Sequence, residues 1–282
     1  MAFRVIQGTF HVVGYSPDGD SVRFKAQNEA NWDLLEGRPV KRNKKGHAQL
    51  RIEAIDTLET HYDNQHQPLQ FADAAALQLF ALLGIRDVVW NAAHSKVTAA
   101  KDGAPGFIIT RTTEENGRPV AFVFGPEQTF TDGQEIFVDT RLAKKSVNYL
   151  MLKAGLAFPT FYDGLFYDLR EAFAAQTAKA RKKKRGLWAV DVSNVFTPIS
   201  GLADVTETHV LLPKLFRRIV AFLAKNGGVF NAAQFIADLK KGNERVLVLN
   251  KLHFTHFDNL VEADADGKIR LTEKPEELVF LA

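Results

Sequence analysis

The sequence predicts an α+β protein with a small closed β-barrel, helices packed around that barrel, and a smaller helix-rich region at the C-terminal end. Two patterns support this fold class. Short segments in which apolar and polar residues alternate recur between residues 4 and 124, as in half-buried strands. An Ala- and Leu-rich segment with helical spacing, residues 71–83, interrupts them and stops at Gly84. Short strands with a helix inserted between them favour a small barrel.

Each expected element follows from its local pattern. Alternation and turn residues predict strands at residues 4–14, 21–25, 50–55, 88–90, 96–99, 106–110 and 119–124. Apolar residues at helical spacing predict further helices at residues 142–156 and 165–185. The last of these ends in five consecutive basic residues, 181–185. They are typical either of a helix C-terminus capped by Gly186 or of a nucleic-acid-binding patch.

Composition limits the classes of protein to which the chain can belong. Its 282 residues favour one large or two modest domains, and a hydrophobic content of 46% is enough for a packed core. There is no cysteine, which excludes disulfides, thiolate metal sites and a cysteine nucleophile. The net charge of +3 permits a polyanionic partner. We expect no membrane span and see no signal peptide, so the chain is expected to be cytoplasmic, or secreted with its signal removed.

The most informative stretch is residues 50–60, LRIEAIDTLET. It opens with strand alternation around Arg51 and ends with Asp56, Thr57 and Glu59 within four positions. Arg51 and Asp56 are an odd number of residues apart, so a regular strand would direct them to opposite faces. We therefore expect a bend or bulge before Asp56, or an arginine side chain that reaches round the edge of the strand.

Two outlying segments extend this pattern: Asp18-Gly19-Asp20-Ser21 upstream and Gly117-Arg118 downstream. The set resembles the staphylococcal nuclease (thermonuclease) family over roughly residues 8–190. That family carries DGD[TS], then R-x4-DTPE, then GR at the head of a later strand. In the same order this chain has Asp18-Gly19-Asp20-Ser21, Arg51, Asp56-Thr57-Leu58-Glu59 and Gly117-Arg118. The one departure is Leu58, where the family usually has proline.

The resemblance implies a five-stranded oligonucleotide-binding-type barrel and a Ca²⁺-dependent, sugar-non-specific nuclease that hydrolyses DNA and RNA. Carboxylate and carbonyl oxygens suit Ca²⁺, and planar guanidinium groups match phosphate oxygens. The implied roles are metal binding by Asp20, Asp56 and the Thr57 carbonyl, steering of water by Asp18, general-base catalysis by Glu59, phosphate binding by Arg51 and Arg118, and nucleotide binding by Tyr162.

Two alternatives remain open. The barrel could be a catalytically inactive module that binds nucleic acid or protein, although an inactive copy is expected to lack a site residue and this chain has all of them. The C-terminal region could be a partner-binding or inhibitory module attached to an enzyme.

The loop at residues 27–47 has a basic tip around Lys44. This tip is either a solvated loop or a segment that contacts successive phosphates of a nucleic acid.

The C-terminal region is expected to form a second domain. We predict a nuclease-like domain at residues 1–191 that folds alone, a linker at 193–207, and an accessory region at 192–282 that could bind a protein partner. Apolar spacing predicts a helix at residues 212–223, and Asn231 is expected to cap another. Short strands are expected at residues 245–249, 268–271 and 278–281, and a hairpin turn at Asp264-Ala265-Asp266-Gly267.

Overall fold

The computed structural model describes residues 2–126 and 130–281. Its contacts divide the chain into two compact units. The barrel unit comprises Met1–Ile55 and Asp73–Met151, and the second unit comprises Asp56–Ala72 and Leu152–Ala282. Within the described residues, no helix is both long and apolar enough to cross a bilayer.

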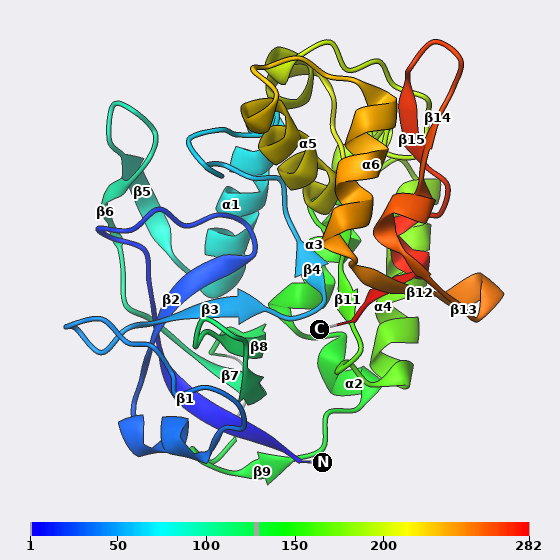
Figure 1. The fold of residues 1–282 in the computed structure, drawn as a ribbon. Helices are drawn as coiled ribbons and strands as arrows, with labels where there is room; N and C mark the ends of the chain where they lie inside the picture. Colours follow the sequence, from blue (N-terminus) through cyan, green and yellow to red (C-terminus); the bar gives the residue numbers. More distant parts are fainter. Residues whose placement is uncertain (1, 127–129, 282) are drawn as a thin grey trace. The chain divides into compact units, whose positions relative to one another are not determined.

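The barrel unit contains the predicted five-stranded closed barrel (Figure 1). The strands run in the order β2-β3-β8-β7-β1, the pairing of β1 with β2 closes the ring, and β9 adds an extra strand beside β1. Among the described strands of this barrel, only β3 and β8 pair in parallel. The strand bounds are β1 Phe3–His11, β2 Ser21–Ala26, β3 Ala48–Ile52, β7 Ala104–Thr113, β8 Pro119–Phe124 and β9 Glu135–Ile136.

Strand alternation places the core of this unit inside the barrel. In β2 and β3, Val22, Phe24, Leu50 and Ile52 are buried, while the residues between them face outward or are only half-buried. Helix α1 (Leu69–Leu83) forms where predicted. Strands β5 (Arg86–Trp90) and β6 (Val97–Lys101) form, but they pair as a separate hairpin outside the barrel sheet.

The single helix expected at residues 142–156 is two helices, α2 (Thr140–Ala143) and α3 (Val147–Ala154). The break has a local cause. The Ser146 hydroxyl accepts a hydrogen bond from the Tyr149 amide (3.2 Å), so this serine starts a new helix as an N-cap does.

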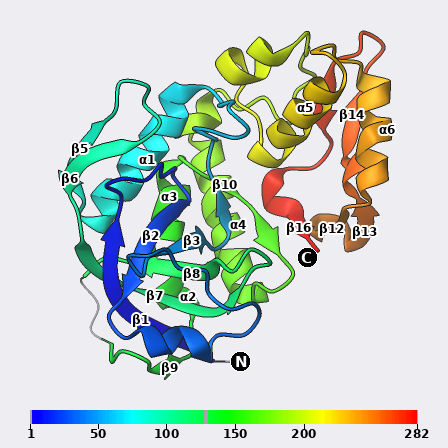
Figure 2. The ribbon, with the colours of Figure 1, turned by 60° about the vertical axis from the view of Figure 1, so that its left-hand side comes forward.

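The second unit combines residues 56–72 with the last predicted nuclease-like helix and the whole C-terminal region. Helices α5 and α6 contact each other, and α6 also contacts β14 (Figure 2). The N-cap predicted at Asn231 is confirmed, because its side chain accepts from the Gln234 amide (3.0 Å). The bounds are β4 Ile55–Asp56 at the junction of the units, β10 Phe158–Pro159, β11 Phe161–Tyr162, α4 Tyr167–Lys182, α5 Pro213–Lys225, α6 Ala232–Gly242, β12 Arg245–Val248, β13 His253–His256, β14 Val261–Ala263, β15 Ile269–Leu271 and β16 Leu278–Phe280.

Residues 193–207, predicted as a linker, lie within the second unit, and side-chain hydrogen bonds hold the start of the segment there. The Ser193 side chain is fully buried and accepts a hydrogen bond from the Leu212 amide (2.8 Å). Asn194 donates to the carbonyl oxygens of Leu271 (2.9 Å) and Glu273 (2.8 Å). These polar side chains supply hydrogen-bond partners for backbone amide and carbonyl groups that have no partner in a helix or sheet.

One hydrophobic core joins the nuclease-like and C-terminal parts of the second unit. Leu58, Phe158 and Trp188 belong to the same cluster of buried side chains as Phe216 and Phe280. The division into two units therefore differs from the domain boundary predicted at residue 191. That residues 1–191 fold alone stays a prediction.

The predicted turn at residues 264–267 is confirmed as the hairpin between β14 and β15.

Candidate active site

Three of the predicted residues lie at adjoining strand positions of the barrel unit. Asp20 immediately precedes β2, and Arg118 immediately precedes β8. Arg51 lies in β3, where its register partners are Ser21 of β2 and Val120 of β8. The strand register therefore brings Asp20, Arg51 and Arg118, which are far apart in the sequence, to neighbouring positions on three adjacent strands of the barrel.

The bend expected before Asp56 is present as a turn at Glu53 and Ala54. Ala54 has a φ of 69°, in the left-handed region that a non-glycine residue adopts only in special turns. The buried Asn148 side chain fixes this turn by donating hydrogen bonds to the carbonyl oxygens of Glu53 (2.8 Å) and Ala121 (3.0 Å). The turn breaks the strand alternation, so Arg51 and Asp56 are not on opposite faces of one regular strand.

Arg118 is held by a carboxylate and keeps one buried donor without a partner. Its Nη2 pairs with Glu114 (3.2 Å), and burial alone would raise the pKa of Glu114. The hydrogen bonds from Arg118 and Asn116 outweigh burial and bring that pKa below its ordinary value. Among the described residues, the buried Nε of Arg118 and the buried Oδ1 of Asp18 have no hydrogen-bond partner. Such atoms fit an absent partner: an anion for Arg118, and water or a cation for Asp18.

A polar row extends from Arg51 along the outer face of β2 and β3. Arg23 is the register partner of Gln49, just as Ser21 is of Arg51, so these four side chains share one face. The Gln49 amide donates to the Ser21 hydroxyl (3.4 Å), which agrees with this placement. Lys25 is exposed and follows Arg23 on the same face. We call Arg23, Lys25, Gln49 and Arg51 the outer row.

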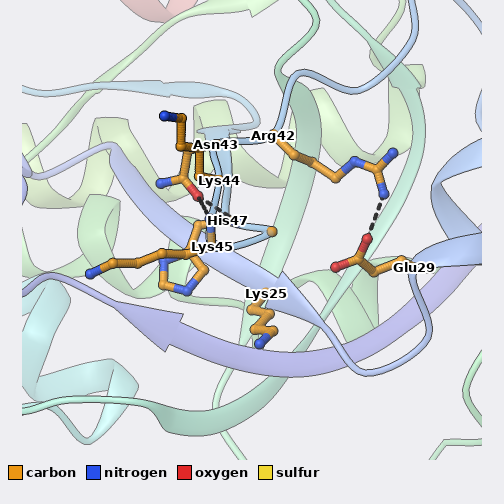
Figure 3. Close-up of a pocket in the computed structure, with 8 residues that line it drawn as sticks. Lys25, Glu29, Arg42, Asn43, Lys44, Lys45 and His47 are labelled. Carbon is orange, nitrogen blue, oxygen red and sulfur yellow. Dashed lines mark hydrogen bonds and ion pairs between the residues drawn. The ribbon is translucent and has the colours of Figure 1, made fainter.

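The outer row leads to a basic hollow at the loop that joins β2 to β3. This open hollow has a volume of about 850 Å³ (Figure 3). Among its described lining residues, the only ion pair joins Arg42 to Glu29 (2.7 Å). The lining residues are Lys25, Glu29, Arg42, Asn43, Lys44, Lys45, Gly46 and His47.

Asn43 organises the tip of this loop. Its side-chain oxygen accepts hydrogen bonds from the amides of Lys45 (2.9 Å) and His47 (3.1 Å), as asparagine does in tight turns. Its side-chain amide donates to the Tyr15 hydroxyl (2.7 Å). The loop is thus attached to the barrel unit while Lys44 and Lys45 stay exposed.

The electrostatics of the hollow are positive. Burial, together with the charges of His11, Lys25 and Lys45, lowers the pKa of His47 to about 4, and Asp102 opposes this only in part. His47 is therefore neutral near neutral pH. The exposed lysines supply the charge that a polyanion would meet.

In the second unit, Asp56, Thr57 and Glu59 lie in a constrained loop. Asp56 and Thr57 are buried. The fully buried Gln67 holds the loop in two directions: its backbone amide donates to the Glu59 carbonyl (2.8 Å), and its side chain donates to the Leu211 carbonyl (2.8 Å). The loop that carries Glu59, the predicted base, is therefore attached to the segment immediately before α5.

Sequence reasoning missed the partner of these carboxylates, which is Arg217 on α5. Its two terminal nitrogens donate to both Asp56 oxygens (2.6 and 3.2 Å), and Nη1 also donates to Glu59. Burial disfavours the guanidinium charge, but Asp56 and Glu59 outweigh it and hold the pKa of Arg217 well above its ordinary value. Nothing in the local pattern around Arg217 indicates a partner 161 residues earlier.

Tyr162 is also engaged within the second unit. Its ring centroid lies 6.1 Å from that of Phe280, and the Lys214 ammonium group lies 5.3 Å from the Tyr162 centroid. The ring thus contributes to packing against the C-terminal region. Nucleotide binding by Tyr162 stays a prediction.

The donor types suit Ca²⁺, but Asp56 already has a cation. Two carboxylates and a carbonyl are ligands that Ca²⁺ takes, with water completing the shell. Within residues 2–126 and 130–281, no three His, Cys, Asp or Glu side chains gather as metal ligands. The predicted ligand set contains two such side chains, Asp20 and Asp56, and one backbone carbonyl. The guanidinium of Arg217 already donates to both oxygens of Asp56, so Ca²⁺ would have to share these oxygens with a second positive charge or displace it.

A comparison with family models finds one described as staphylococcal nuclease homologue, which matches residues 49–190, half of the chain. A search of individually curated proteins finds no match. The matched range includes Arg51, Asp56, Glu59 and Arg118.

Proposed function

Because the chain belongs to the family of staphylococcal nuclease homologues, we propose that it is a nuclease that hydrolyses phosphodiester bonds in DNA and RNA with Ca²⁺. The observation that carries this proposal is the strand register around Arg51. Its partner in β2 is Ser21, which follows Asp20, and its partner in β8 is Val120, two residues after Arg118. The partnerless Nε of Arg118 supports it, because a phosphate oxygen would satisfy that donor.

The proposed roles follow from the chemistry of each side chain. Arg51 and Arg118 bind the scissile phosphate through planar guanidinium groups and stabilise the charge that grows as water attacks. Glu59 accepts a proton from the attacking water. Asp20, Asp56 and the Thr57 carbonyl are the proposed ligands of Ca²⁺, which when bound would neutralise phosphate charge. Asp18 orients water beside them.

The outer row and the basic hollow extend the proposed substrate site. Lys25 lies four positions after Ser21, a span of roughly 13 Å at the usual rise of a strand. A nucleic-acid strand bound at Arg51 could therefore continue along Arg23 to Lys25, Lys44 and Lys45. This path favours substrates of several nucleotides over single nucleotides, because the lysines contact phosphates that are not cleaved.

A second candidate function is a catalytically inactive nucleic-acid-binding module. The pairing of Arg217 with Asp56 and Glu59 favours it, because this pairing engages a proposed metal ligand and the proposed base.

One pair of measurements separates these candidates. Digestion of plasmid DNA and of single-stranded RNA is followed with Ca²⁺ and with a chelator, alongside fluorescence anisotropy of labelled single-stranded DNA. A nuclease cleaves both substrates with Ca²⁺ and neither with chelator. Tight binding without cleavage at millimolar Ca²⁺ would identify the inactive module instead.

A further inference from the structure

Arg217 joins the C-terminal region to two of the predicted site residues, Asp56 and Glu59. It binds both oxygens of Asp56 and also pairs with Glu59. The side chains of Asp56 and Glu59 are only 8% and 14% exposed, and that of Arg217 is 25% exposed. A bidentate pair shielded in this way is stronger than an ordinary surface ion pair.

The contact rests on a well-packed part of the second unit. Leu215, Phe216 and Ile219 bury the apolar face of α5, and Leu58 belongs to the same core. The Tyr62 ring meets Phe216 edge to face at 6.4 Å. Leu58, the one departure from the family pattern, thus adds apolar surface to the core that carries Arg217.

The chemistry of the contact opposes both proposed roles of the carboxylates. A Ca²⁺ ion needs carboxylate oxygens, and the guanidinium donates to both oxygens of Asp56 and holds a positive charge beside them that repels a second cation. A general base needs a lone pair directed at water, whereas Glu59 accepts a hydrogen bond from a permanent cation.

We propose that Arg217 is an internal counter-cation that competes with Ca²⁺ for Asp56 and masks Glu59, so that the C-terminal region restrains the nuclease. The inference rests on the proposed function for the roles of Asp56 and Glu59. Because the competitor is part of the chain, its effective concentration is constant, and Ca²⁺ must exceed a threshold before the site becomes active.

The adjacent Arg218 provides a matched control. It lies on the same helix, and its side chain is also 25% exposed. It pairs with Glu244, which retains Lys214 at 2.8 Å when Arg218 is removed. Arg217→Gln and Arg218→Gln therefore remove the same charge from neighbouring positions, and only the first removes the guanidinium contact with Asp56 and Glu59.

The test is Ca²⁺ titration of the full chain by isothermal calorimetry, with thermal melting to confirm folding. Arg217→Gln should tighten Ca²⁺ binding by roughly 10- to 100-fold, the range that corresponds to one charge-assisted hydrogen-bonded pair. Arg218→Gln should bind Ca²⁺ as the unaltered chain does. Arg217→Lys keeps the charge without the planar fork, so it should fall between them. It also carries the test if Arg217→Gln does not fold.

The other outcomes distinguish failure of the masking role from failure of the proposed nuclease function. Equal Ca²⁺ affinity in the folded Arg217 variants and the unaltered chain overturns the masking role, and so does loss of binding on removal of Arg217. If Arg217→Gln binds Ca²⁺ more tightly but no variant cleaves nucleic acid, masking stands and the nuclease proposal fails. If no folded variant binds Ca²⁺, both the calcium assignment and the masking role fail.

Discussion

The candidate residues fall into a basic half in the barrel unit and an acidic half in the second unit, and the two sets differ in how their charges are compensated. In the barrel unit, Arg23, Lys25 and Arg51 follow one outer face, and Lys44 and Lys45 extend it at an exposed loop tip. In the second unit, the carboxylates of Asp56 and Glu59 are shielded and share one guanidinium from the same unit.

This difference follows from the cost of burying charge. Exposed lysines are solvated and need no partner, so they remain available to a polyanion. Shielded carboxylates lose solvation and need a cation or hydrogen-bond donors. The basic half of the candidate residues thus stays available to a polyanion, while the acidic half is compensated within its own unit. Four changes test this contrast, from the largest expected effect to the smallest.

Removal of residues 192–282 tests whether the acidic half depends on the C-terminal region. Leu58, Phe158 and Trp188 share their core with residues that this truncation deletes. Against the prediction from sequence that residues 1–191 fold alone, we expect a chain ending at residue 191 to lose cooperative unfolding and all detectable cleavage. Thermal melting and plasmid digestion measure this. A soluble, active fragment would establish the domain boundary predicted at residue 191 and show that the barrel needs no C-terminal support.

Glu59→Gln tests the acidic half directly. The loss of a general base typically slows turnover by roughly 10²–10⁴-fold. Single-stranded DNA binding in Ca²⁺ should change little, because Glu59 is proposed to act on water rather than on phosphate. Initial rates at saturating substrate and anisotropy measure the two effects. Full activity in this variant would move the base to another group.

Arg51→Lys and Arg118→Lys test the catalytic end of the basic half. Each should cost roughly 10²–10³-fold in rate, as the loss of one electrostatic group at a transition state does. Lysine keeps the charge but lacks the planar fork, so it should not rescue either position. Single-turnover rates measure the effect. Wild-type cleavage by the double variant would return both arginines to structural ion pairs, as the contact of Arg118 with Glu114 would then suggest.

Lys44→Gln/Lys45→Gln tests the outer end of the basic half. The logarithm of the affinity for single-stranded DNA should depend less on the logarithm of the salt concentration, with a slope smaller by about 1.4, because each phosphate contact contributes about 0.7. Salt-dependent anisotropy in chelator measures the slope. Lys144→Gln/Lys145→Gln is the control, since it removes the same charge from exposed residues of the same unit. Equal changes in both variants would mean that net charge, rather than the hollow, governs binding.

The sequence by itself determined the barrel and the identity of the candidate residues. Alternation in β2, β3 and β8 predicts strands because the side-chain period is local, and the order of Asp20, Arg51, Asp56, Glu59 and Arg118 indicates the family that the comparison confirms. The helical stripe of α5 and the cap at Asn231 were predictable for the same reason.

Only the tertiary structure decided how these pieces are satisfied. The Asn148 side chain holds the turn after β3, Gln67 attaches the Glu59 loop to Leu211, and Arg217 compensates Asp56 and Glu59. Each of these contacts joins residues far apart in the chain. Each also supplies a hydrogen-bond or ion-pair partner to a buried polar group or a shielded charge. Local patterns specify which groups need partners, but packing over long sequence separations selects the partner.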